Sequence, residues 1–156
     1  MVARRSQNPG NVTLRTMRDQ DVAAIMAIEE RAYPFPWTAG IFHDCLRAGY
    51  SCHVLERGDE LIGYGVMSAG AREAHILNVC VSPDERGRGF GRMLMDRMIE
   101  QARRLQAEMM FLEVRPSNQP ALRLYAQLGF NEIGTRNNYY PAAQGREDAL
   151  ILAKQL

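Results

Sequence analysis

The stretch that decides the fold prediction is Val79-Cys-Val-Ser-Pro-Asp-Glu-Arg-Gly-Arg-Gly-Phe-Gly91, in which a β-type run leads through glycines into an amphipathic helix. Glycine lets backbone N–H groups turn toward one point. The first turn of a helix adds free N–H donors and the positive end of the helix dipole. This arrangement suits an anionic phosphate, and we expect a pyrophosphate as the ligand.

Other interpretations of these glycines are possible. The spacing Gly87-x-Gly89-x-Gly91 differs from the Gly-x-Gly-x-x-Gly of dinucleotide folds, and no Gly-Lys-Ser/Thr follows to indicate a nucleoside triphosphate. Arginine-glycine segments that bind RNA are usually repeated and disordered, whereas this one is single and lies between regular elements. A glycine loop with a purely structural role stays open.

The surrounding pattern predicts a strand, two helices, a meander, a helix, a strand, a helix and further strands, which is not a regular βαβ array. Helix 90–105 has a buried stripe, and strands at 52–56, 61–68 and 74–81 form an antiparallel meander before it. A strand at 109–114, a helix at 118–128 and strands at 130–136 and 149–154 follow it. The expected stripe consists of Phe90, Leu94, Met98 and Ala102, reinforced by Ile99 and Leu105.

The N-terminal third predicts a strand at 11–15 and two helices. A capping-box-like start at 16–19 opens the first helix, which runs to about residue 32, and Trp37-Thr38 opens the second, which ends near Gly49. In the second helix Ile41, Phe42 and either Cys45 or Leu46 face inward. The whole pattern predicts an α/β or α+β sheet covered by helices. We expect one domain over residues 11–156, preceded by a disordered leader at 1–10.

Composition excludes several classes of function. The formal net charge is +1, so neither nucleic acid nor an anionic membrane is favoured as a direct partner. No apolar stretch follows the first residues, and we expect a cytoplasmic protein. The three cysteines, Cys45, Cys52 and Cys80, form no Cys-x-x-Cys pair, which indicates reduced thiols. No zinc or other metal site is expected.

One carboxylate stands in an otherwise apolar strand, at Glu113. An α-amino group has a pKa of about 8 and is mostly protonated at neutral pH, so an enzyme that makes it a nucleophile needs a proton acceptor. A carboxylate at the end of a buried strand can accept that proton, directly or through water. The alternatives are an ion pair with Arg115 or another basic group, or an outward-facing position at the sheet edge.

The run Arg86-x-x-Gly89-x-Gly91 resembles the acyl-CoA motif of the GNAT acetyltransferase superfamily. The resemblance implies a mixed central sheet of about seven strands with helices on both faces, and acetyl-CoA as cosubstrate. It implies that the amides of residues 87–92 hold the CoA pyrophosphate, and that the main chain of residues 79–81 pairs with the pantetheine arm. The cofactor-binding residues so implied are Val79, Cys80, Val81, Gly87, Arg88, Gly89, Phe90, Gly91 and Arg92. For the Cys80 side chain, a small buried hydrophobe is favoured over a nucleophile.

The segment from Asn118 to Phe130 resembles the GNAT segment in which an asparagine contacts pantetheine and a tyrosine meets its sulfur. The resemblance implies that Asn118 binds the cofactor and that Tyr125 is the general acid for the departing thiolate, while Glu113 is the base. The structural alternatives are a helix N-cap for Asn118 and a ring packed on the sheet for Tyr125.

Further motifs narrow the resemblance to RimI-type enzymes, over about residues 12–153. These enzymes acetylate the N-terminal alanine of the eighteenth small-subunit ribosomal protein, so the implied partner is that N-terminal peptide. Trp37 and Tyr139 are candidates for the walls of a peptide groove, with loop anchoring as the alternative; for Tyr140, anchoring is favoured. The motifs are Phe35-Pro-Trp37, Leu112-Glu-Val-Arg115, Ser117-Asn118, Asn138-Tyr-Tyr-Pro141 and Gly145-Arg-Glu-Asp148.

Two other functions share these features. An acetyltransferase for a small amine, such as a polyamine or an antibiotic, would use the same turn, acid and base but an enclosed acidic pocket. A non-catalytic module would bind acyl-CoA through the turn and transfer nothing. The presence of both Glu113 and Tyr125 argues against that module.

Overall fold

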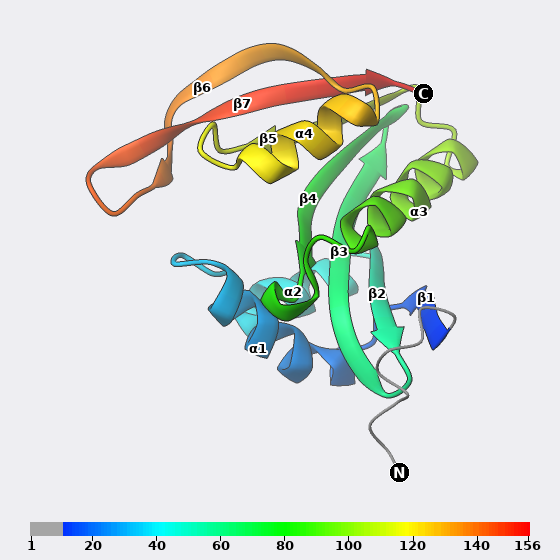
Figure 1. Cartoon of the computed structure of the whole chain (residues 1–156). Coiled ribbons are helices and arrows are strands. Elements are labelled where there is room, and N and C mark those ends of the chain that lie inside the picture. Colours follow the sequence, from blue (N-terminus) through cyan, green and yellow to red (C-terminus); the bar gives the residue numbers. More distant parts are fainter. Residues whose placement is uncertain (1–10) are drawn as a thin grey trace. The chain divides into compact units, whose positions relative to one another are not determined.

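The computed structural model in Figure 1 describes residues 11–156, so the expected leader at 1–10 lies outside the described residues. The predicted elements are all present. Along the chain they are β1 (Val12–Thr16), the 3-10 turn η3 (Asp19–Asp21), α1 (Val22–Ala32), α2 (Ala39–Arg47), β2 (Ser51–Arg57), β3 (Glu60–Gly70), β4 (Glu73–Val81), the 3-10 turn η4 (Pro83–Glu85), α3 (Phe90–Arg104), β5 (Met109–Val114), α4 (Gln119–Gln127), β6 (Asn131–Pro141) and β7 (Arg146–Gln155).

The strands form a seven-stranded sheet in the order β1-β2-β3-β4-β5-β7-β6, which confirms the expected mixed sheet. Strands β1, β2 and β3 pair antiparallel. β4 and β5 pair parallel, which requires a crossover, and α3 supplies it. β7 then pairs antiparallel with both β5 and β6.

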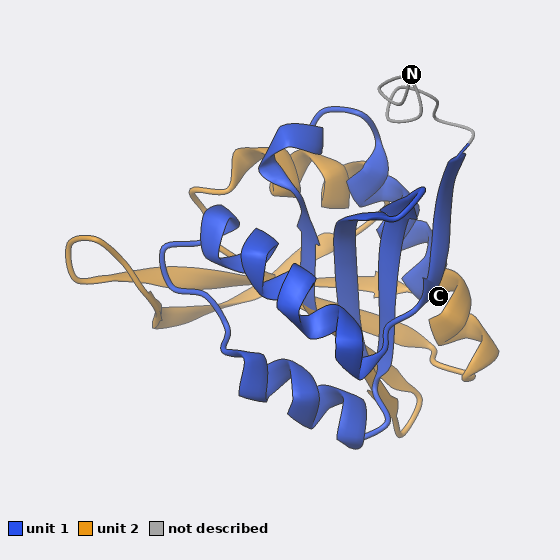
Figure 2. Ribbon diagram, turned by 90° about the horizontal axis from the view of Figure 1, so that it is seen from below, with its two compact units in different colours: residues 1–67, 78–98 blue, residues 68–77, 99–156 orange. Residues whose placement is uncertain are grey.

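The described chain forms two compact units, which Figure 2 colours separately. The N-terminal unit contains the described residues up to Met67 together with Asn78–Met98. The C-terminal unit contains Ser68–Leu77 and Ile99–Leu156. The glycine-rich turn belongs to the N-terminal unit, and Glu113 and Tyr125 belong to the C-terminal unit.

Helices cover both faces of the strands in the N-terminal unit. Tyr64 and Val66 on β3 point into a core shared with α1 and α2, where Ile25 and Phe42 are fully buried. The intervening glycine, Gly65, faces α3. A Cβ atom there would lie 2.7 Å from the Met98 methyl carbon, so α3 packs directly on the β3 backbone. Successive residues of a strand face opposite sides, so α3 covers the face opposite α1 and α2.

The buried stripe of α3 matches its sequence prediction: Phe90, Leu94, Met98, Ile99 and Ala102 are all buried. Two expected inward residues are exposed. Leu105 follows the last residue of α3, and Ile41 lies on the first turn of α2, beside the fully buried Phe42. Among residues 11–156, no helix has the length and apolar character needed to cross a membrane.

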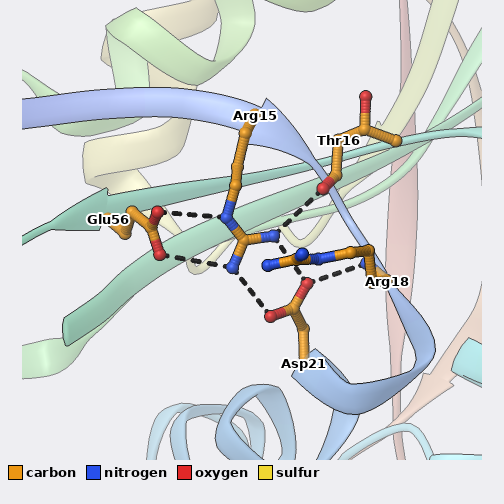
Figure 3. Close-up of polar contacts among 5 residues, drawn as sticks. All are labelled: Arg15, Thr16, Arg18, Asp21 and Glu56. Carbon is orange, nitrogen blue, oxygen red and sulfur yellow. Dashed lines mark hydrogen bonds and ion pairs between the residues drawn. The ribbon is translucent and has the colours of Figure 1, made fainter. Parts of the chain in front are cut away.

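The first helix begins later than the sequence predicts. Arg15 donates hydrogen bonds to Asp21 at 2.8 Å and to Glu56 on β2 at 3.0 Å, so its guanidinium joins β1, β2 and η3 (Figure 3). The Asp21 carboxylate also accepts a 2.7 Å bond from the Arg18 amide. These bonds favour a separate 3-10 turn at Asp19–Asp21, and α1 starts at Val22.

The last hairpin is longer than expected. β6 continues from the predicted end at Arg136 to Pro141, and β7 begins at Arg146 instead of Ala149. The β6–β7 register shifts between Arg136 and Tyr140, which indicates a bulge there. Most of β6 is exposed, so it lacks the alternating apolar pattern from which strands are predicted.

Candidate functional site

The glycine-rich turn has the conformation that its sequence predicts. Gly87 and Gly89 have φ angles of +77° and +84°, a region that other L-residues rarely adopt. The helix follows at once: the Met93 amide bonds the Gly89 carbonyl at 3.1 Å. The three preceding amides, those of Phe90, Gly91 and Arg92, therefore have no acceptor within the helix. Free donors at a helix N-terminus favour an anion.

A buried ion pair holds this turn. Arg57 at the end of β2 donates to both carboxylate oxygens of Glu85, one bond being 3.0 Å long, and both residues are buried. These bonds hold the pKa of Glu85 below its ordinary value. Arg88 adds a 3.2 Å contact to Glu85, which leaves it less able to serve as a free cation toward a phosphate. Arg86 turns back to the Val81 carbonyl at 3.4 Å.

The strand before the turn, Val79 to Val81, is contacted by the residue that follows α1. The Tyr33 hydroxyl donates to the Val79 carbonyl at 3.2 Å. Cys80 is buried, and burial raises the pKa of its thiol. A buried thiol with a raised pKa is a poor nucleophile, which supports the packing role for this side chain.

In the C-terminal unit, Glu113 forms an ion pair that the sequence left open. Its Oε1 lies 3.0 Å from Nε of Arg136, while Arg115, the nearer candidate in sequence, pairs with Glu147 at 3.1 Å. Arg136 lies on β6, two strands from β5 in the sheet order and so about 10 Å away by strand spacing. Only a long side chain spans that distance, and no sequence spacing indicates it.

Two tyrosines complete the surroundings of Glu113. Burial, followed by the charge and a hydrogen bond of Glu113, raises the pKa of Tyr139. Burial also raises the pKa of Tyr140 to about 12, and Glu113 adds to that effect. The Arg136 guanidinium lies over the Tyr139 ring at 5.4 Å, and that of Arg115 lies over the Tyr140 ring at 4.4 Å. A carboxylate, two phenols and two guanidiniums therefore gather in this unit.

The hairpin motifs hold this cluster in place. Asp148 accepts a 2.8 Å bond from the Asn138 amide, and Asn138 itself has a φ of +54°. Arg146 donates to the carbonyls of Asn138 and Tyr139 at 2.6 and 2.8 Å. Glu147 accepts from Arg115 and from the Ser117 amide. The motifs 138–141 and 145–148 thus fix the bulge that carries Tyr139.

Asn118 shows the cap contact given as its structural alternative, and the Tyr125 ring contacts Phe130, the residue before β6. Tyr125 is partly buried, its ring lies 5.8 Å from that of Phe130, and burial raises the pKa of its phenol to about 12. A phenol with a raised pKa stays protonated at neutral pH and can donate. Asn118 caps α4, with its Oδ1 accepting the Ala121 amide at 3.3 Å.

Trp37 anchors the loop between α1 and α2. Its ring lies 5.2 Å from that of Phe42 and packs against the core of the N-terminal unit. Phe35, two residues earlier, is the exposed aromatic of this loop, with 46% of its surface accessible. The Trp37 ring thus has the anchoring role that was the alternative to substrate binding. A contact between Trp37 and a substrate stays a prediction.

A family model described as the acetyltransferase (GNAT) family matches residues 22–130. The alanine N-acetyltransferase of ribosomal protein bS18 from Salmonella typhimurium is 38% identical over 141 residues, which cover 90% of this chain and 95% of that protein. The crystal structure of the corresponding Escherichia coli enzyme superimposes with a TM-score of 0.87 at 35% identity and covers 92% of this chain and 93% of the other. A structure of Ard1 from Thermoplasma volcanium gives a TM-score of 0.86 at 26% identity, with 94% and 98% covered.

Proposed function

The chain belongs to the GNAT acetyltransferase family, and from that premise we propose that it transfers the acetyl group of acetyl-CoA to the N-terminal alanine of the eighteenth small-subunit ribosomal protein, in the cytoplasm. What carries this proposal is the similarity to bS18-alanine N-acetyltransferases over 90% of the chain. The fold alone would not suffice, since one fold hosts many substrates.

The cosubstrate is held through its phosphates in this proposal. The free amides of Phe90, Gly91 and Arg92 and the turn at Gly87–Gly89 bind the CoA diphosphate. The segment Val79–Val81 pairs with the pantetheine arm, and Asn118 contributes a contact to it. We infer no metal in the reaction, since amide and side-chain donors suffice for these steps.

The proton transfers belong to two residues of the C-terminal unit. The Glu113 carboxylate accepts a proton from the substrate ammonium, and the neutral amine attacks the thioester carbon. The new C–N bond forms as the C–S bond breaks. Tyr125, whose pKa is raised to about 12, donates its proton to the thiolate, and the second amine proton restores the phenol. The products are the acetylated N-terminus, free CoA and one proton.

The peptide is placed beside Glu113 by the same cluster. A substrate ammonium is a cation that can replace the Arg136 guanidinium at Glu113, because the Arg136 side chain is 56% exposed and an exposed ion pair is weak. Tyr139, 44% exposed, then offers a ring and a hydroxyl to the first peptide residues. Trp37 supports the peptide from the α1–α2 loop.

A substrate panel tests this function. Peptides that begin Ala-Arg, the same peptides with a blocked N-terminus, and free polyamines are incubated with acetyl-CoA, and CoA release is measured. We expect release with the free peptides only. If only polyamines react, the chain is a small-amine acetyltransferase. If the protein binds CoA and acetylates none of them, it is an acyl-CoA-binding module.

A further inference from the structure

The N-terminal unit contains a buried carboxylate that the proposed reaction does not use. Glu29 on α1 is 2% exposed. It accepts hydrogen bonds from the Tyr64 hydroxyl at 2.5 Å, the Asn78 side-chain amide at 3.2 Å and the Trp37 backbone amide at 2.9 Å. No ion pair found among residues 11–156 includes Glu29.

A carboxylate in such a place is costly, because burial removes the water that stabilises its charge. Neutral donors offset that cost only if their geometry is held. The donors here come from three different segments: Tyr64 from β3, Asn78 from β4 and Trp37 from the loop after α1. Hydrogen bonds to a charged acceptor are about twice as strong as neutral ones, so Glu29 joins these segments more firmly than an amide would.

Several contacts hold the loop segment 33–37 to Glu29 and to the core of the N-terminal unit. The Tyr33 amide bonds the Glu29 carbonyl at 3.1 Å and ends α1. Four residues later the Trp37 amide meets the Glu29 side chain, and the Trp37 ring packs on Phe42. Phe42 in turn meets the Tyr64 ring edge-on, with centroids 5.6 Å apart. Both ends of the loop segment 33–37 are therefore tied to the same glutamate.

On β4, the residue that Glu29 contacts lies next to the segment proposed to bind pantetheine. Asn78 directly precedes Val79, whose carbonyl accepts the Tyr33 hydroxyl. The segment from Asn78 to Val79 is thus held by Glu29 on α1 and by Tyr33, the residue that follows α1. The C-terminal end of α1 therefore connects the loop 33–37 to the start of the segment 79–81.

We propose that Glu29 is a positioning residue, whose carboxylate fixes the α1–α2 loop against β4 so that the peptide-binding loop is ordered before substrate arrives. This inference rests on the proposed function, in which that loop meets the peptide and β4 meets the coenzyme. Ordering the loop in advance removes an entropic cost from peptide binding. Glu29 acts through Trp37 and Asn78 and touches neither substrate.

The two oxygens of the Glu29 carboxylate have different hydrogen-bond partners, so one substitution can remove the loop contact and keep the strand contacts. Tyr64 and Asn78 both bond Oε1, and Trp37 bonds Oε2. In Glu29→Gln the side chain has a single oxygen. This oxygen retains two hydrogen bonds, from Tyr64 and Asn78, if it takes the Oε1 position. The amide nitrogen that the substitution introduces is a donor, and it then faces the Trp37 N–H, which is also a donor. The variant therefore releases the loop and retains the strand contacts.

Steady-state kinetics with an Ala-Arg peptide and acetyl-CoA test the proposal, with Glu30→Gln as control. Glu30 is the adjacent residue of the same helix and is exposed. We expect the peptide KM of Glu29→Gln to rise about tenfold, the size of one lost bond to a charged group. The kcat and the Kd for CoA should stay within about twofold of wild type, and Glu30→Gln should match wild type throughout.

The possible results distinguish a failure of the positioning role of Glu29 from a failure of the proposed function. If wild type acetylates the peptide but a folded Glu29→Gln keeps the wild-type peptide KM, or loses kcat and CoA affinity to the same extent, the positioning role is overturned. If wild type itself does not turn over, the proposed function fails first. Amide hydrogen exchange at Trp37 gives a second measurement if the variant does not fold. In wild type the Trp37 N–H should be protected, and rapid exchange there contradicts the proposal.

Discussion

Replacing Gly89 by alanine should weaken CoA binding without a steric clash. No heavy atom lies within 4 Å of a Cβ built at Gly89, so the effect is conformational. At a φ of +84°, an L-residue costs about 1–2 kcal/mol. The alanine variant relaxes away from this conformation when free, and CoA binding has to restore it. This conformational free energy then opposes CoA binding, and the Kd for CoA rises about 5- to 30-fold.

Isothermal titration with CoA measures this change, and Gly49→Ala is the matched control. Gly49 follows α2, has a φ of +77° and has no heavy atom within 4 Å of a built Cβ, but it lies outside the CoA-binding turn. The same backbone strain therefore lowers the stability of this variant, and its Kd for CoA should change less than about threefold. Thermal unfolding monitors the fold of both variants. Wild-type affinity in a folded Gly89→Ala, or equal losses in the two variants, would refute the reasoning.

Three further predictions concern the chemistry and the stability. Glu113→Gln should lower kcat about 10²- to 10⁴-fold at neutral pH and less at high pH, where the free amine predominates; a uniform loss across the pH profile would remove Glu113 as the base. Tyr125→Phe should slow turnover while the CoA Kd stays close to wild type, and an unchanged rate excludes it as the acid. The third concerns Glu85, whose pKa is lowered in the folded chain by Arg57. Its contribution to stability is present above the ordinary pKa of 4.5 and is lost as pH falls through the lower folded pKa. Urea unfolding of Glu85→Gln should therefore show a smaller loss of stability below about pH 4.5 than wild type, and parallel curves would contradict this.

The turn and its helix could be predicted from sequence because their signals are local. Positive φ angles at Gly87 and Gly89 favour glycine, and the apolar spacing from Phe90 to Ala102 is that of one helix face. The sequence predicts β5 with the bounds that the structure has, Met109–Val114, because five of its six residues are apolar. Signals of this kind do not depend on distant parts of the chain.

Contacts between distant segments could not be predicted in the same way. Glu113 pairs with Arg136 across β7, and the strand order that permits this pair is a property of the whole sheet. Glu29 reads in sequence as one of two acidic residues near a helix end, and its burial depends on β3, β4 and the loop after α1. The extension of β6 beyond Arg136 depends on side-chain bonds from Arg146 and Asp148 that no periodicity indicates.

The most direct measurement of the central claim is the intact mass of each ribosomal protein from cells with and without this chain. The account predicts that one small-subunit protein, with alanine at its N-terminus, lacks an acetyl group in the cells without the chain, and that expression of wild type but not of Glu113→Gln restores it. Identical masses in both kinds of cell would contradict the proposed substrate.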